Sequence, residues 1–488
     1  MRAGGPLALA LLAAGCAITT PDPRPPAPPA TAWQAALPHG GEVTQLAQWW
    51  QRFDDPILLQ LIEAGQRDNP GLAAAVARID QARATARVAG AGRLPSVDLN
   101  SQITRTSSPL PPSITSTVAA ASLDAGWELD LFGANRRTRE AAVARVAART
   151  ADWHAARVSL AAETATAYAN LRLCESLLTV YRQDLDSQRR TLSLTERKVR
   201  AGFTAPADAA LITAGGAEAA NRVRGQRGEC DLLIKSLVTL TAMPEPALRQ
   251  TLAPRAGRLP QPPALAVAAV PAETLAQRPD LAALERELVA ASGEVGIAEA
   301  DRYPQLRLSG SIGYAAFRAL GTTGKATTWS FGPALSLPLF DGDRRAGVVD
   351  QAQARFDELV ANYRERVHAA VREVEVALVR VESAGDRLGD AERGADRVQT
   401  SLKAAQSRYD TGAGSVFELE DARRQALNAA AALLQVRAER VAAWLSLYKA
   451  LGGGWRNDAA GANGDPAGAN GDPAGANRPP PATPRNSG

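Results

Sequence analysis

Two hydrophobic patterns alternate along this chain of 488 residues. Four runs place apolar residues at every second position, which is typical of β-strands. The run from Leu306 to Tyr314, for example, alternates apolar residues with Arg and Ser. Between the runs lie long stretches rich in Ala, Leu, Glu, Gln and Arg, which favour helix. The pattern predicts a mainly α-helical protein that also contains four strands.

The four strand-like runs form two pairs, at about residues 95–131 and 304–340. In the first pair, Leu123 and Trp127 alternate with polar residues such as Asp124. A half-buried sheet of a soluble domain alternates in this way. A membrane barrel does so too, with apolar residues toward lipid and polar residues toward the lumen over about 10 residues per strand. The pattern alone leaves both interpretations open.

The long helical stretches are predicted to fold back as hairpins. Gly133–Ala201 has neither Pro nor Gly in its interior, and a single helix of this length would extend on the order of 100 Å. After the second turn, Ser415 and Glu418 have the spacing of a capping box. After the first turn, Thr204 and Pro206 are predicted to start the next helix. We therefore expect coiled-coil-like antiparallel hairpins.

The same order of elements occurs twice in the sequence. Asn69–Leu72 matches Arg278–Leu281 at an offset of 278 − 69 = 209, and Phe132 matches Phe340 at 340 − 132 = 208. A nearly constant offset predicts an internal duplication. The predicted organisation is a signal peptide at 1–15, a Pro-rich tether at 16–40, repeat 1 at 41–243 (strands about 95–131, hairpin about 133–243), a linker at 244–268, repeat 2 at 269–455 (strands about 304–340, hairpin about 342–451), and a disordered low-complexity tail at 456–488.

The N-terminal sequence MRAGGPLALALLAAGC indicates export. Arg2 precedes an apolar run that is too short to span a bilayer as a helix. The run ends at Cys16 and resembles a bacterial lipoprotein signal, in which this Cys is acylated, for example with palmitate. An ordinary secretory signal with an incidental Cys is the alternative.

No later segment has about 20 consecutive apolar residues, so a transmembrane helix is not expected. If the chain crosses a membrane, it must do so as β-strands in a closed barrel. The smallest membrane barrels have about eight strands, and an open edge is excluded in lipid. Four strands per chain therefore imply that several chains share one barrel.

Two cysteines remain besides Cys16, namely Cys174 and Cys230. They lie 204 − 174 = 30 residues before and 230 − 204 = 26 residues after Thr204, so an antiparallel hairpin brings them nearly level, within about one helical turn. In an oxidising compartment this spacing allows a disulfide. Two buried free thiols are the alternative.

Composition and motifs exclude several function classes. The net charge is +4, from 55 basic and 51 acidic residues, so nothing indicates a nucleic-acid partner. His39, His154 and His368 lack metal-ligand spacing. The chain has no P-loop, GxSxG or dinucleotide-binding motif. We expect a protein that is not an enzyme and that has no metal or cofactor except a covalent lipid on Cys16.

Five longer segments carry a family resemblance. They read WWQRFDDPILLQLIEAGQRDNP, WELDLFGANRR, RPDL, FGPALSLPLFDGDRR and SLYKALGGGW. Over about residues 45–455 the chain resembles the TolC-like outer-membrane efflux factors, in the lipidated NodT-type branch. The resemblance implies a homotrimeric channel-tunnel of a tripartite efflux pump, with a 12-stranded barrel in the outer membrane and helices in the periplasm. It also implies a periplasmic adaptor and an inner-membrane transporter as partners.

The resemblance further implies a gate at the periplasmic helix tips. In the segment TGAGSVFELEDARRQ, Phe417 falls on an apolar ring and Asp421 on an acidic ring, with Glu418 and Glu420 as further candidates. Three copies of one carboxylate would form a cation-attracting constriction. A carboxylate in the first turn is also favoured by the helix dipole alone. The candidates for contact with an adaptor are Gly202, Thr204, Asp208 and Gly412.

Two other classes share some of these features. A periplasmic adaptor also carries a helical hairpin and often a lipid anchor, but it lacks duplicated strand pairs. A coiled-coil structural lipoprotein would need no strands. The two strand pairs therefore favour the channel.

Overall fold

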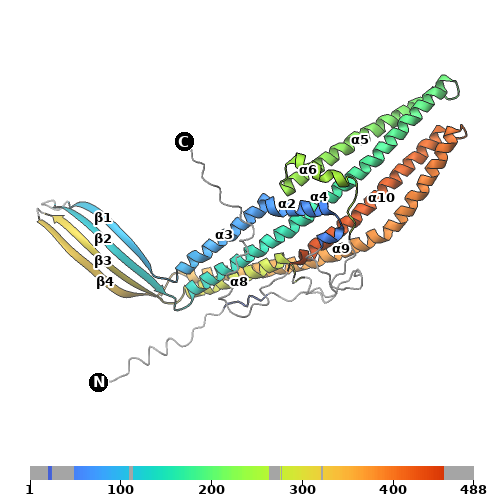
Figure 1. Ribbon diagram of the computed structural model, residues 1–488. Helices are drawn as coiled ribbons and strands as arrows, with labels where there is room; N and C mark the ends of the chain where they lie inside the picture. Colours follow the sequence, from blue (N-terminus) through green and yellow to red (C-terminus); the bar gives the residue numbers. More distant parts are fainter. Residues whose placement is uncertain are drawn as a thin grey trace. The chain divides into compact units, whose positions relative to one another are not determined.

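The chain folds into two compact units, shown in a computed structural model in Figure 1. The strand unit comprises the described residues of 1–27, 76–152 and 281–366, and the hairpin unit comprises the described residues of 28–75, 153–280 and 367–488. Cys16, His39 and the predicted tail lie outside the described residues. The structure describes residues 20–24, 49–108, 114–262, 275, 277–319 and 322–455.

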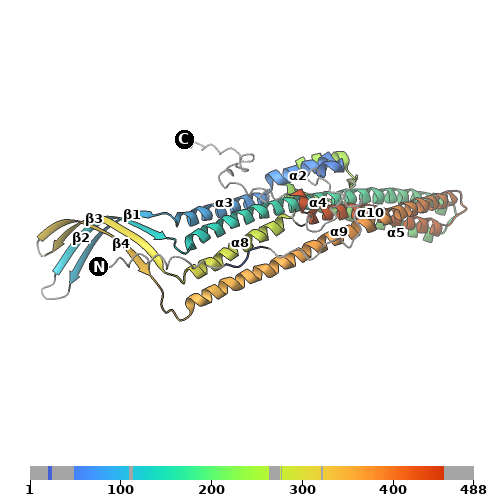
Figure 2. The same cartoon turned by 90° about the horizontal axis from the view of Figure 1, so that it is seen from below.

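The strand unit holds one antiparallel sheet in the order β1-β2-β3-β4 (Figures 1 and 2). The strands are β1 (Ser96–Ser108), β2 (Ile114–Leu129), β3 (Gln305–Ala319) and β4 (Thr322–Ser336). The four predicted strands are therefore present. β4 ends at Ser336, before the predicted Leu339, because its partner Gln305 is the first residue of β3. Within the described residues, β1 and β4 each keep one edge without a neighbouring strand.

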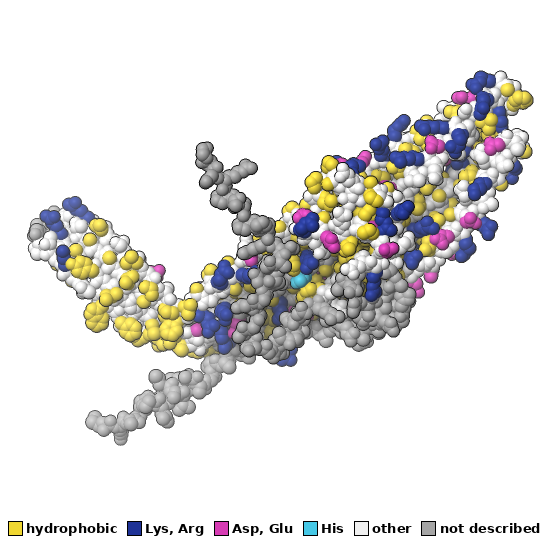
Figure 3. All heavy atoms as spheres, viewed as in Figure 1, with side chains coloured by type: hydrophobic (Ala, Val, Ile, Leu, Met, Phe, Trp, Pro, Cys, Tyr) yellow, Lys and Arg dark blue, Asp and Glu magenta, His cyan; other side chains and the backbone are white. Residues whose placement is uncertain are grey.

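The sheet has one apolar and one polar face. The register aligns Leu99, Leu123, Ile312 and Trp329 across the four strands, and these side chains are 71%, 48%, 59% and 80% exposed. Figure 3 shows hydrophobic side chains along the strands. Residues that share a register row lie on one face, so we name this side the apolar face. The adjacent row, on the polar face, is Asp98, Asp124, Ser311 and Ser330.

The helices repeat in matching lengths. The two longest helices have 67 residues each, and the helices before each strand pair have 22 residues each. No helix among the described residues combines the length and apolarity needed to cross a bilayer. The principal helices are α2 (Pro56–Asp68), α3 (Pro70–Ala91), α4 (Ala134–Arg200), α5 (Pro206–Thr241), α6 (Glu245–Leu252), α8 (Pro279–Ala300), α9 (Arg344–Asp410) and α10 (Val416–Ala450), with short 3₁₀ turns η3 (Trp50–Phe53), η4 (Ala253–Arg255) and η5 (Gly452–Gly454).

Carboxylates start both long helices after the strands. Asp130 accepts from the backbone N–H groups of Asn135 and Arg136, at 3.0 and 2.7 Å. Asp341 accepts from the backbone N–H and the side chain of Arg345, at 3.3 and 2.9 Å. The Arg345 side chain holds the pKa of Asp341 below its usual range. These contacts give a physical role to the LFGANRR and LFDGDRR segments.

The duplication has a counterpart in the hydrogen bonds of the hairpin unit. Asn69 donates through Nδ2 to the carbonyl of Leu240, at 3.0 Å. Arg278 donates to the carbonyl of Ala450, also at 3.0 Å. The donors are 278 − 69 = 209 residues apart and the acceptors 450 − 240 = 210. Both residues thus tie the start of a repeat to the end of its second hairpin helix.

An aromatic core closes the hairpin unit near the chain ends. Trp49, Trp50 and Phe53 pack with Trp444 and Tyr448, and all five are buried. Trp50 donates from Nε1 to the Tyr448 hydroxyl at 3.2 Å, and burial raises the pKa of Tyr448 to about 12. Each large buried side chain contributes roughly 1.5–3 kcal/mol. The WWQRF and SLYKALGGGW segments therefore meet in one core.

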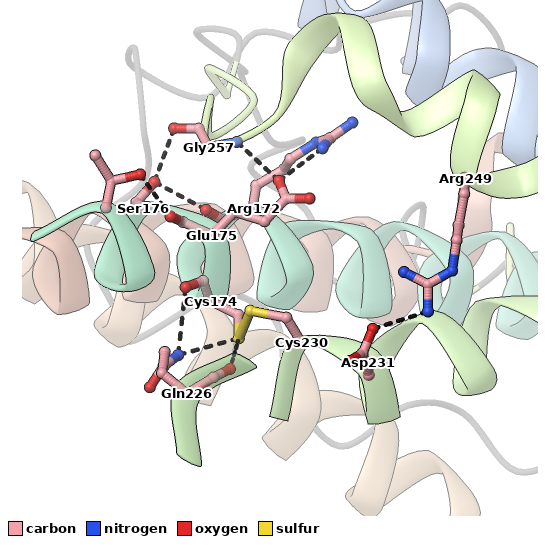
Figure 4. Close-up of a disulfide and its surroundings, with 10 residues drawn as sticks. Arg172, Cys174, Glu175, Ser176, Gln226, Cys230, Asp231, Arg249 and Gly257 are labelled. Atoms are coloured by element: carbon pink, nitrogen blue, oxygen red, sulfur yellow. Dashed lines mark hydrogen bonds and ion pairs between the residues drawn. A yellow bond between two sulfur atoms is a disulfide. The ribbon is translucent and has the colours of Figure 1, made fainter. Parts of the chain in front are cut away.

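A disulfide joins α4 to α5, between Cys174 and Cys230, whose Cα atoms are 5.6 Å apart (Figure 4). The segment after α5 lies against the same turns of α4. Arg172 donates to the Leu252 carbonyl at 2.7 Å, and Ser176 donates to the Gly257 carbonyl at 2.7 Å. The predicted linker at 244–268 thus clamps α4 beside the disulfide in its described part.

Candidate gate at the hairpin tips

Both hairpins turn with the same backbone geometry. Gly202 and Gly412 have φ of +78° and +80°. Phe203 N donates to the Lys198 carbonyl at 2.9 Å, and Ala413 N donates to the Arg408 carbonyl at 2.8 Å. Positive φ in the residue after a helix is the usual helix-ending arrangement for glycine. The two tips are therefore equivalent in fold, 210 residues apart.

The helices that leave the two turns begin differently. The predicted capping box is confirmed in α10, where Ser415 Oγ accepts from Glu418 N at 3.1 Å and Ser415 N donates to Glu418 at 3.3 Å. The predicted role of Thr204 is wrong, because α5 has Ala205 as its N-cap and no side-chain cap. Pro206 takes the first helical position, as predicted, which moves the cap one residue past Thr204.

The two residues predicted for the gate rings lie on α10 near its start. The Phe417 side chain is 66% exposed, and Phe203 on the other tip is 84% exposed. Asp421 forms an ion pair with Arg424 and accepts from Gln425 Nε2 at 2.6 Å. The carboxylate is thus half exposed and already partnered by a cation of its own helix. In any ring of Asp421 carboxylates, each carboxylate would therefore have the Arg424 cation beside it.

Glu420 stands directly before Asp421 in the sequence, but its side chain has different partners. Its carboxylate pairs with Arg423 and accepts from Gln188 Nε2 at 2.7 Å. The Arg423 side chain is only 4% exposed and donates to Thr191 Oγ1 at 2.8 Å. Burial makes such a pair costly to break, since one charge would be left without its partner. Glu420 therefore connects α10 to α4.

A second set of contacts lies closer to the tips. Lys198 donates from Nζ to the Tyr409 carbonyl at 2.9 Å and lies 4.1 Å from the centre of the Tyr409 ring. Thr195 Oγ1 and the Tyr409 hydroxyl are 2.7 Å apart. The two sets together define the tip network, which consists of Ser187, Gln188, Thr191, Thr195 and Lys198 of α4, Gln406 and Tyr409 of α9, and Glu420 and Arg423 of α10.

Sequence reasoning missed Arg423, Tyr409 and Lys198. Arg423 is part of an Arg-rich stretch, and only the fold brings it against a helix more than 200 residues earlier. The usable signal was on α4, where Ser187, Thr191 and Thr195 recur every fourth residue and so share one helical face.

The four candidates for adaptor contact all lie at the tips. Gly202 and Gly412 are exposed in the turns, whereas Thr204 and Asp208 are half-buried. Asp208 is in the first turn of α5, where the helix dipole favours a carboxylate. Over the ranges that the structure describes, no cluster of three or more His, Cys, Asp or Glu side chains is arranged to hold a metal.

The profile of a family described as outer membrane efflux protein matches residues 61–220 and again residues 270–453. The chain belongs to this family. One match falls in each predicted repeat. The mainly helical fold, the resemblance stated above and the assignment to outer-membrane efflux are thereby confirmed.

Relatives and solved structures agree with this family. Nodulation protein T of Rhizobium leguminosarum bv. trifolii is 30% identical over 90% of this chain and 94% of its own. Outer membrane protein OprJ of Pseudomonas aeruginosa is 30% identical, over 92% and 95%. The structure of the outer-membrane channel OprN is 31% identical with a TM-score of 0.81, covering 90% of this chain and all of that one. The Campylobacter jejuni CmeC outer membrane channel has the same fold, with a TM-score of 0.81 at 23% identity over 91% and 96%.

Proposed function

We propose that three copies of this chain form an outer-membrane channel-tunnel, the passive exit duct of a tripartite efflux pump. The observation that carries the proposal is the exposed apolar face of a four-stranded sheet with two open edges. An open edge is not stable in lipid, whereas three such sheets would close a barrel of 12 strands. The polar face then lines the lumen.

The helices would lie in the periplasm, where a periplasmic adaptor and an inner-membrane transporter deliver small molecules. Gly202, Thr204, Asp208 and Gly412 are the proposed contacts with the adaptor. Acyl chains on Cys16 would anchor the chain to the outer membrane. The duct needs no catalytic group and no cofactor beyond that lipid, since it supplies a path and a gate.

The gate is proposed at the tip of the α9/α10 hairpin. Phe417 supplies apolar bulk, and Asp421 with Arg424 supplies charge, while Glu418 is committed to the capping box. The tip network holds α9 and α10 against α4 and so keeps the tunnel closed. Opening requires that hairpin to move away from α4, which would break the contacts of Arg423 and Tyr409.

Single-channel conductance in planar bilayers tests the proposal. Phe417→Ala/Asp421→Ala should enlarge the small openings expected of the wild type. Phe203→Ala, which removes an even more exposed ring from the other tip, is the control and should leave conductance unchanged. Equal conductance of wild type and double variant would place the gate elsewhere. A correctly assembled protein without any conductance would refute the channel.

A further inference from the structure

Three cations occupy the end of the sheet that lies away from its helices. They are Arg105 on β1, Arg318 on β3 and Lys325 on β4, and all three are exposed. Dark blue Lys and Arg side chains are visible at this end of the strands in Figure 3. The helices of the strand unit join the opposite strand ends, so the cations lie toward the two strand-connecting turns.

The register places all three cations on the apolar face. Arg105 aligns with Thr117, and Thr117 aligns with Arg318. Lys325 pairs with Ala316, two residues from Arg318 and therefore on the same side of β3. The apolar face thus changes from hydrophobic to cationic near the turns. Arg307, by contrast, is paired with Glu128 on the polar face.

The cations have no acidic neighbour in this part of the sheet. No Asp or Glu occurs in the sequence between Asp98 and Asp124, or between Asp301 and Asp341. The nearest strand carboxylate, Asp124, is on the polar face and accepts from Asn100 and Ser122, at 2.7 and 2.9 Å. The positive charge on the apolar face is therefore not compensated within the sheet.

The spacing suits one polyanionic headgroup. Arg105 and Arg318 are separated by one strand, so their backbones are about 10 Å apart. Lys325 is a diagonal neighbour of Arg318, at about 7–8 Å. Closure of a barrel would bring β4 of one copy beside β1 of the next. Arg105 of the next copy would then lie beside Lys325.

Position along the strand points to the membrane surface. On β3 the apolar row runs from Leu306 to Tyr314 before Arg318, and a tilted strand crosses the hydrocarbon core in about 9–11 residues. A cation facing lipid is costly at the bilayer centre but costs about 0–1 kcal/mol near an interface. Long Arg and Lys side chains reach headgroups from such positions.

We propose that Arg105, Arg318 and Lys325 form a binding site for a phosphate-bearing glycolipid of the outer leaflet. The proposal rests on the proposed channel, which places the strand-connecting turns at the cell surface. Arg binds phosphate through paired charge-assisted hydrogen bonds, and Lys adds a point charge. The adjoining apolar row, with Tyr314 and Trp329, contacts the acyl chains of the same lipid.

Native mass spectrometry of the detergent-purified protein tests this site, with diphosphoryl lipid A and its phosphate-free counterpart as probes. Arg105→Gln/Arg318→Gln/Lys325→Gln should bind the phosphorylated lipid on the order of 100-fold more weakly, since each cation near a charged lipid surface contributes about a factor of five. The matched control removes three exposed cations of the helices α4 and α5, as Arg189→Gln/Arg224→Gln/Arg227→Gln, and should bind as the wild type does.

Two results would overturn the site: equal binding of diphosphoryl lipid A by the triple variant, or equal retention of the phosphate-free lipid by the wild type. The conductance of both variants shows whether a failure concerns the lipid site or the channel. A triple variant that loses lipid binding but keeps its conductance is the result that both proposals expect. If the triple variant does not assemble, Lys325→Gln on the edge strand gives the same comparison with a loss of about fivefold.

Discussion

The two helical hairpins share their turn geometry and helix lengths but are held in different ways. The α4/α5 hairpin is cross-linked by Cys174–Cys230 and clamped by the segment that follows it. Repeat 2 contains no cysteine. The α9/α10 hairpin instead contacts α4 through the tip network, in which Arg423 and Tyr409 are the central side chains.

This difference separates a fixed hairpin from a releasable one. A hydrogen bond in a folded protein contributes about 0.5–1.5 kcal/mol net, so binding of another protein can replace it. A disulfide is not exchanged in this way in an oxidising compartment. Under the gating proposed above, the α4/α5 hairpin would be the support against which the α9/α10 hairpin moves.

The largest effect is expected from removing the cross-link. Cys174→Ala/Cys230→Ala opens a loop with a sequence separation of 56 residues and should lower the free energy of unfolding by about 4 kcal/mol on the chain-entropy account. Thermal unfolding of purified protein, with reduced wild type as a second sample, measures the loss. Conductance at room temperature should not change. A variant with wild-type stability but larger openings would reverse the roles assigned to the two hairpins.

Breaking the tip network should have the next largest effect. Arg423→Gln leaves Glu420 partly buried without its cation, which costs on the order of 3 kcal/mol, and channel openings should become larger and more frequent. Arg189→Gln is the matched control, because Arg189 is 67% exposed in its pair with Asp186 and an exposed pair contributes at most about 1 kcal/mol. Closed channels in the Arg423 variant would show that the network does not hold the gate.

A smaller effect is expected from substitutions at the starts of α10 and α5. Ser415→Ala removes the side-chain cap of α10 and should cost about 1 kcal/mol. Thr204→Ala removes no cap from α5 and should stay within about 0.5 kcal/mol. Denaturant midpoints of the two variants provide the comparison. Equal losses would mean that Thr204 stabilises its turn through another contact.

The smallest expected effect is a pH-dependent change in stability. It comes from the pair of Glu285 and Tyr363, which is present only in repeat 2. Burial raises the pKa of Glu285, although the Tyr363 hydroxyl donates to it at 3.2 Å. Repeat 1 has Val76 and Trp153 at the equivalent positions (285 − 209 and 363 − 210). A raised folded-state pKa gives stability that is present below the unfolded pKa, about 4.3, and is lost as pH rises through the folded value.

Wild type should therefore lose stability relative to Glu285→Gln as the pH rises from about 4 to 7, because Gln cannot ionise. Melting temperatures of both proteins at these pH values measure the difference. A constant difference between wild type and variant across this range would contradict an ionising Glu285. Val76 carries no titratable group, so the equivalent position of repeat 1 should not add to this part of the pH dependence.

Local patterns predicted the strands, the helices and the capping box, because each depends on neighbours within a few residues. Long-range packing decided the rest. Glu420 and Asp421 are adjacent in sequence, yet only the contact with α4 shows that they have different partners. Thr204 was assigned a cap because its chemistry was right, but Pro206 fixed the helix start one residue later. The cations of the apolar face became a group only through the strand register.

The contact of the N-terminal segment with Gly296 and Ser292 of α8 has a consequence for assembly. Thr20 Cγ2 lies 2.6 Å from where a Cβ of this residue would be, and Ser292 donates to the Pro21 carbonyl at 2.7 Å, so the N-terminal segment passes over α8. Cys16, the proposed acylation site, is four residues before Thr20 in the sequence. Acyl chains there would confine unassembled copies to one membrane plane. Their effective concentration would then far exceed that of free chains, so under the trimer proposed above association would precede barrel closure.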